Sequence, residues 1–235
     1  MKRLLSFMRL DCVLQRRYRF YHAAVFMTLV WIVVLRSVRP EVLPTAVPFV
    51  VFVDLAVVGF YFMAGSLLFE KGERTLLALL TSPLRFGEFL TARLATLTLL
   101  AAGVSFAVAL ASYGPHFNAA LFAAGVILSS VITLLAGIFA VAPYESISRF
   151  LIPSQLYVIV LYLPLIPFFG WWRSPVFYLV PTHGSLLLLS GAFGSIPSWQ
   201  IFYAVAYQIL WLFPLTVMVR RRFHRHMAGR GGPNR

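Results

Sequence analysis

The feature that most constrains this sequence is a succession of apolar runs, each about as long as a lipid bilayer is thick. Of the 235 residues, 60% are hydrophobic and only 11% are charged, whereas a soluble domain carries roughly a quarter charged residues. Recurrent apolar runs of about 18 residues or more indicate membrane-spanning helices. The sequence therefore predicts an all-α, polytopic membrane protein.

The runs predict six transmembrane helices, together with an N-terminal amphipathic interfacial helix and a charged cytoplasmic helix between the second and third spans, which the resemblance described below identifies as a coupling helix. We expect one transmembrane domain over 1–235, with a six-span bundle over 21–219. Each run is long enough for a hydrocarbon core of ~30 Å. The predicted spans are 21–37, 46–69, 89–111, 118–142, 152–171 and 200–219.

Residues 1–20 alternate basic and apolar side chains. This pattern predicts an amphipathic helix that lies on the membrane surface. A cleaved signal peptide is the competing interpretation, but no small-residue cleavage site follows the apolar positions. The one cysteine, Cys12, excludes an internal disulfide bond.

Basic residues are distributed unevenly about the predicted spans. With the N-terminus in the cytoplasm, seventeen of the twenty Lys and Arg residues lie on the inner side, and Arg36, Arg39 and Arg173 lie outside. The positive-inside rule then places both termini in the cytoplasm. We expect the basic tail, 220–235, to bind anionic lipid headgroups and not nucleic acid, which accounts for much of the net charge of +13.

The longest predicted outer connection, 172–199, is apolar but contains several Pro and Gly residues. Such a segment is too interrupted to span a bilayer. We expect 175–194 to form short re-entrant helices that enter the outer leaflet before the last span.

The segment 70–93 is dense in charge and lies between two apolar runs, so it is predicted to lie at the cytoplasmic surface. Ser82-Pro83 has the pattern of a helix start, with Ser as N-cap and Pro at the first position. Glu88 then lies near a helix N-terminus, where a negative charge is favourable. An ordinary solvated loop is the alternative interpretation.

This segment resembles the coupling region of ABC-2-type transporter permeases. The shared elements are Glu70-Lys71-Gly72-Glu73, Thr75-Leu76, Leu79-Leu80, Thr81-Ser82-Pro83, Glu88 and Ala92-Arg93. Two positions depart from the family pattern, because Arg74 stands where Gly is usual and Leu77 where an acid is usual.

The resemblance implies a half-transporter, in which two permeases form the pathway and two separate ATPase subunits supply the work. The sequence has no G-x-x-x-x-G-K-[ST] phosphate loop, so ATP and Mg would be bound by the partner. We expect no cofactor in this chain and no enzymatic activity of its own. The resemblance assigns the ATPase contact to the coupling loop, 70–88, and to a second contact at 143–150; the candidate residues are Glu70, Lys71, Glu73, Arg74, Thr75, Thr81, Ser82, Pro83, Arg85, Glu88, Glu145 and Arg149.

Asp54 is an acid inside the second predicted span. Insertion of such a residue costs about 2.5–3.5 kcal/mol, so it should face the bundle interior or a polar path. It could bind a cationic substrate, relay a proton, or be neutral and hydrogen-bonded between helices. Tyr61 and Phe62 are further candidates for a substrate path, and no His or acid pair has the spacing of a metal site.

The function that this resemblance implies is ATP-driven export of a hydrophobic or amphiphilic substrate, possibly a drug or antibiotic, across the inner membrane of a prokaryote. The run from Tyr178 to Gly194, Y-L-V-P-T-H-G-S-L-L-L-L-S-G-A-F-G, resembles permeases described as fluoroquinolone exporters. The expected partners are two ABC ATPase subunits, a second permease (in a homodimer or heterodimer) and membrane lipid. A membrane-embedded enzyme or a non-transporting assembly factor is the alternative from a different class.

Overall fold

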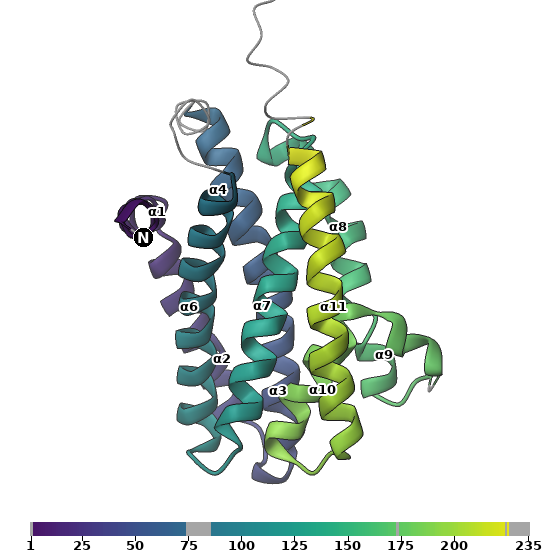
Figure 1. Ribbon diagram of the computed structural model, residues 1–235. Coiled ribbons are helices and arrows are strands. Elements are labelled where there is room, and N and C mark those ends of the chain that lie inside the picture. Colours follow the sequence, from purple (N-terminus) through teal and green to yellow (C-terminus); the bar gives the residue numbers. More distant parts are fainter. Residues whose placement is uncertain (1, 74–85, 173, 224, 226–235) are drawn as a thin grey trace, which may run out of the picture.

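The computed structural model describes residues 2–73, 86–172, 174–223 and 225, and every regular element in these ranges is a helix. Long helices run side by side in a bundle, and α1 (Lys2–Arg17) lies across its flank (Figure 1). The all-helical prediction is therefore confirmed for the described residues. The long bundle helices are α2 (Phe20–Arg36), α6 (Phe86–Tyr113), α7 (Ala119–Val141), α8 (Ile147–Tyr162) and α11 (Ser198–Phe223).

One rod-like helical segment runs from Pro40 to Gly72. It consists of the short 3-10 helix η1 (Pro40–Val42), α3 (Leu43–Asp54), the π-helical segment η2 (Leu55–Gly59) and α4 (Phe60–Gly72). A π-helical turn inside an α-helix often marks a functional position. Asp54 is the last residue of α3 before this turn.

Four of the described helices are long and apolar enough to cross a membrane: Pro40–Gly72, α6, α7 and α11. The bent pair of α1 and α2 makes a fifth if it is counted as one span. The chain is thus a polytopic membrane protein. Six spans remain a prediction, because α2 and α8 are each shorter than these helices.

The predicted helix over 152–171 is wrong in its second half. α8 ends at Tyr162, and the short helix α9 (Leu165–Phe168) follows in a different direction (Figure 1). Pro164 and Pro167 explain this break, because proline has no N–H to donate and its ring clashes with the preceding turn.

The predicted re-entrant segment contains the 3-10 helix η3 (Pro175–Leu179) and the helix α10 (Pro181–Phe193). α10 packs against α7, α11 and α3, and Leu188 and Leu189 are fully buried. The close contact with α11 requires Gly184, where a Cβ atom would lie 2.9 Å from Gln208 Nε2 and 3.0 Å from the Ala204 carbonyl oxygen. This short helix is therefore part of the core.

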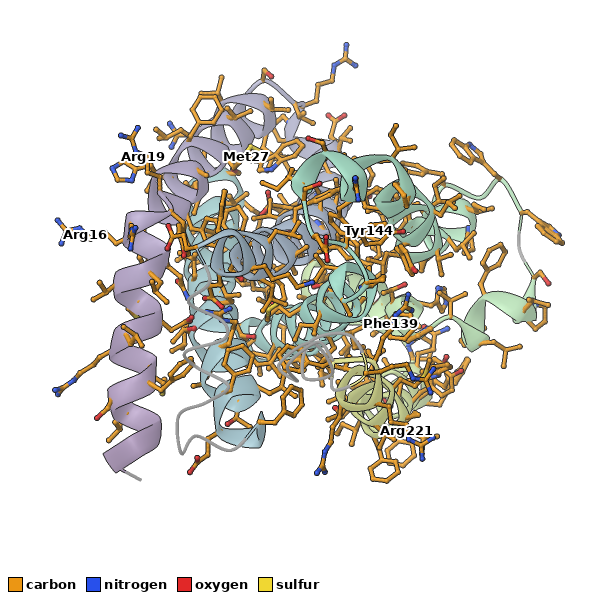
Figure 2. All side chains as sticks on the ribbon, turned by 90° about the horizontal axis from the view of Figure 1, so that it is seen from above. Arg16, Arg19, Met27, Phe139, Tyr144 and Arg221 are labelled. Atoms are coloured by element: carbon orange, nitrogen blue, oxygen red, sulfur yellow. The ribbon has the colours of Figure 1, made fainter. Side chains whose placement is uncertain are left out.

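α1 and α2 meet at a bend of 65°. Arg19 permits the turn by adopting the left-handed conformation, with φ of 60°, which is uncommon for a residue with a side chain. α1 packs against α6. Seen along the bundle, Arg16 and Arg19 point away from the protein (Figure 2), as expected for a helix whose outer face meets solvent or lipid headgroups.

The rod and α7 approach each other closely at two glycines. A Cβ atom on Gly137 of α7 would lie 2.6 Å from the carbonyl oxygen of Phe60, and one on Gly59 would lie 2.9 Å from Thr133 Oγ1. No atom lies within 4 Å of a Cβ built on Gly65. The helix contact therefore depends on Gly59 and Gly137, and not on Gly65.

We expect Gly137→Ala to destabilise the protein by roughly 1–3 kcal/mol, because the added methyl forces two packed backbones apart. The matched control, Gly65→Ala, should be neutral or slightly stabilising, because alanine favours the helix by roughly 0.5–1 kcal/mol. The measurement is thermal unfolding of each variant in the same detergent. Equal melting temperatures for the two variants would contradict the close approach.

Candidate functional site

The described residues of the two predicted ATPase contacts lie at one end of the bundle, where α4 ends, α6 begins and α7 joins α8. We call it the charged end; it is the upper end in Figure 1. The side of α1 also reaches this region, through contacts to α6. Four separate parts of the chain therefore meet there.

Arg93 of α6 is the centre of the charged end, with only 1% of its surface exposed. Its guanidinium binds both carboxylate oxygens of Glu70: Nη1 lies 3.1 Å from Oε2, and Nη2 contacts Oε1. It also binds Asp11 of α1, with Nε 2.9 Å and Nη2 2.8 Å from Oδ1. One buried cation thus joins α1, α4 and α6.

The remaining oxygen of Asp11 is also paired. Gln15 Nε2 donates to Asp11 Oδ2 at 2.7 Å, and Thr96 Oγ1 donates to the same atom. Phe7, Asp11 and Gln15 are 5%, 1% and 3% exposed, and their spacing of four residues places them on one face of α1. α1 therefore binds the bundle through a mainly polar face.

Glu73 lies on the surface of the charged end and ties it to the bend between α1 and α2. Arg17 Nη2 lies 3.1 Å from Glu73 Oε1, and the Tyr18 hydroxyl donates to Oε2 at 3.2 Å. Burial, and secondarily the charge of Glu73, raises the pKa of Tyr18 to about 12. Tyr18 therefore stays protonated, as a donor, throughout the physiological pH range.

Lys71 joins α4 to the segment that follows α7. Its Nζ donates to the carbonyl oxygens of Ala142 at 3.0 Å and Tyr144 at 2.6 Å. A cation at this position satisfies carbonyl groups that a helix C-terminus leaves unpaired and favours its dipole. Lys71 therefore connects the first predicted ATPase contact to the second, near Glu145.

The candidate coupling residues fall into three groups. Glu145 and Arg149 are exposed, as a contact surface requires, and Glu88 lies half-buried in the first turn of α6. Glu70 has no exposed surface, so direct contact with a partner is not available to it; its position in the interior is explained by the ion pair with Arg93. The candidates Arg74, Thr75, Thr81, Ser82, Pro83 and Arg85 lie outside the described residues.

Sequence reasoning missed Asp11 and Gln15. A signal was present, because Asp11 is the one acid among the first 40 residues and stands in a strongly basic helix. An acid four residues from both an aromatic residue and a glutamine could have indicated a helix face that pairs with a buried cation. The sequence places Arg93 at the end of the coupling motif and does not indicate that its side chain is buried.

The three candidate substrate-path residues lie in two different places in the fold. Asp54 and Phe62 line one cavity of about 20 Å³, which has room for about one water molecule. Trp31 Nε1 donates to Asp54 Oδ1 at 2.9 Å. Tyr61 instead faces α8, where its hydroxyl lies 3.0 Å from Ser154 Oγ and accepts from Gln155 at 2.8 Å.

Helices long and apolar enough to cross the membrane, with a charged end built from four chain segments, define the class of a polytopic membrane protein. The chain belongs to the fluoroquinolones export permease protein family, whose model matches residues 2–231. Two curated relatives from different strains of Mycobacterium tuberculosis, each named a fluoroquinolones export permease protein, are 37% identical over 235 residues. The alignments cover 99% of this chain and 99% of each relative. No solved structure matches the chain.

The buried charges give a prediction for stability. Arg93→Met leaves Asp11 and Glu70 buried without their cation, and breaking a buried ion pair in this way costs about 3–5 kcal/mol. Replacing all three residues with apolar ones (Asp11→Leu, Glu70→Leu, Arg93→Met) should restore much of the stability, because no charge is then left unpaired. Thermal unfolding in detergent measures both effects.

If the triple variant is less stable than Arg93→Met, the ion pairs add net stability to the folded protein beyond offsetting the cost of burying the three charges. If Arg93→Met is as stable as the parent protein, Arg93 is not a buried cation in the folded protein.

Proposed function

We propose that this chain is an ABC-2-type permease subunit of an ATP-driven exporter, with six spans and both termini in the cytoplasm. Family membership supports a transporter permease. The absence of a phosphate loop from the sequence supports a separate ATPase. The observation that carries the proposal is that Lys71, in the first predicted coupling segment, binds the carbonyl oxygens of Ala142 and Tyr144, next to the second predicted contact.

The proposed docking surface consists of Glu73, Glu145 and Arg149 together with the loop 74–85. Its flanks are fixed to the bundle: Glu70 binds Arg93, and Glu73 binds Arg17. A push on this surface would therefore move α1, α4 and α6 together. Rigid attachment of this kind is what transmission of work from an ATPase requires.

The proposed substrate is a hydrophobic or amphiphilic small molecule that crosses the inner membrane of a prokaryotic cell. The relatives are named for export of fluoroquinolones, and these drugs are our first candidates for this chain. A complete exporter would hold two permeases, identical or related, and two ATPase subunits that bind ATP and Mg.

The test of this proposal is affinity purification of the chain from native membranes in mild detergent, followed by measurement of Mg-dependent ATP hydrolysis. We expect an ATPase to co-purify with the parent protein, and Glu145→Arg combined with Arg149→Glu to reduce its recovery at least ~10-fold by reversing charge across the contact. The matched control is Glu41→Arg, an exposed charge reversal at the opposite end.

Recovery of an ATPase by all three proteins would show that the exposed charges after α7 do not form the contact. Absence of any ATPase would reject the ABC assignment and favour an assembly factor or membrane enzyme.

Asp54 gives a separate prediction. Because its cavity holds about one water molecule, we expect a packing role. Asp54→Asn retains an oxygen that accepts from Trp31, so stability and drug export should be unchanged. Asp54→Leu leaves the Trp31 N–H buried without an acceptor and should cost about 1–3 kcal/mol. Loss of export in a stable Asp54→Asn protein would instead place this residue in the substrate path.

A further inference from the structure

A second and much larger cavity is lined by residues of α9, η3 and α10. Its volume is about 430 Å³, which is within the range of pockets that hold drug-sized ligands. One wall comes from Pro164, Pro167 and Phe168, and another from Phe177 and Tyr178. The third wall is the face of α10 that carries His183 and Ser190.

The polar side chains of α10 divide according to what they face. Thr182 Oγ1 donates to the Leu161 carbonyl at 3.0 Å, and Ser185 Oγ donates to Gln208 Oε1 at 2.7 Å. His183 Nδ1 and Ser190 Oγ are shielded from solvent and have no hydrogen-bond partner among the described residues. The two polar side chains of α10 that line the cavity are thus the two that lack hydrogen-bond partners.

Both unpaired atoms belong to side chains on the cavity wall. Leaving a buried polar atom without a partner is unfavourable, and His183 is only 7% exposed. Its seven-residue separation from Ser190 is about two helical turns, so both residues lie on one face of α10. A rotation of each side chain would turn its polar atom toward a ligand in the cavity, which could then donate to one atom and accept from the other.

The aromatic wall is held in place before any ligand binds. Tyr203 donates a hydrogen bond to the Tyr178 carbonyl, and Gln200 Nε2 donates to the Tyr178 hydroxyl at 3.3 Å. The rings of Tyr178 and His183 meet edge-on, with centroids 4.9 Å apart. Fixed aromatic and proline walls favour a flat aromatic molecule, because little side-chain freedom is lost on binding.

We propose that this cavity, bounded by α9, η3 and α10, binds an aromatic amphiphile through hydrogen bonds to His183 and Ser190. Lipid tails could fill the apolar part of the cavity but would leave both polar atoms unpaired. The site adds a binding place to the export function proposed above and rests on it for the choice of fluoroquinolone as probe. The cavity beside Asp54, at about 20 Å³, is too small for such a molecule.

The test is binding of ciprofloxacin, a fluorescent fluoroquinolone, to the purified full-length protein in lipid nanodiscs, measured by fluorescence anisotropy. We expect saturable binding that His183→Ala weakens about 10-fold, because the ligand loses one buried hydrogen bond. Ser190→Ala should weaken binding less. Leu187→Trp, which fills the cavity without removing either polar group, should abolish binding.

The matched control is His116→Ala, which removes an exposed histidine from a different cavity and should leave the affinity unchanged. A melting temperature for each variant separates lost binding from lost folding. His183→Asn, whose amide can replace the Nδ1 hydrogen bond, should recover part of the affinity.

Equal affinity for ciprofloxacin in the parent, His183→Ala and Leu187→Trp proteins would overturn the site. Binding of ciprofloxacin to protein-free nanodiscs as strong as to the protein would overturn it as well. Site-dependent binding without ATP-driven export would support the site and reject the exporter. Export that survives Leu187→Trp unchanged would show that substrate passes elsewhere.

Discussion

The charged end of the bundle depends on the pairing of one buried cation with two buried carboxylates. Arg93 cannot remain charged in the interior unless Asp11 and Glu70 accompany it, since the desolvation of an unpaired ion costs several kcal/mol. The same pairing requires α1 to lie against the bundle, because Asp11 reaches Arg93 only from there. Electrostatics therefore fixes the place of a helix that its amphipathic sequence alone would assign to the membrane surface.

The charged end and the cavity beside α10 are connected through packed helices. The rod from Pro40 to Gly72 contains Glu70 of the charged end, and it contacts α7 closely at Gly59 and Gly137. α7 in turn packs against α10, which carries His183 and Ser190.

The sequence predicted the helical class and most of the long helices, because apolar runs of bilayer length leave few alternatives. It also predicted a break within 175–194 from the Pro and Gly content. It did not predict the early end of α8, because the apolar run continues through Pro164 and Pro167 and hydropathy does not register how proline breaks a helix. The sequence does not indicate that Asp11 pairs with Arg93, because two residues 82 positions apart form no local pattern.

Within the candidate site, the exposure of Glu145 and Arg149 follows from their place in the predicted loop 143–150, whereas the burial of Glu70 depends on the fold. Glu70 and Glu73 stand three residues apart, yet one is fully buried and the other exposed. The charge pattern alone does not separate interior residues from surface residues in this segment; three-dimensional pairing does.

The burial of α10 has a consequence for biogenesis. Leu186, Leu189, Ala192 and Phe193 complete a core cluster whose other buried residues come from α2, the rod from Pro40 to Gly72, α6 and α7. During synthesis those four elements leave the ribosome well before residue 181. This core cluster therefore stays incomplete until α10, a helix too short to cross the bilayer, has been made. The membrane-inserted intermediate therefore holds an unfilled apolar surface, which late insertion of α10 closes.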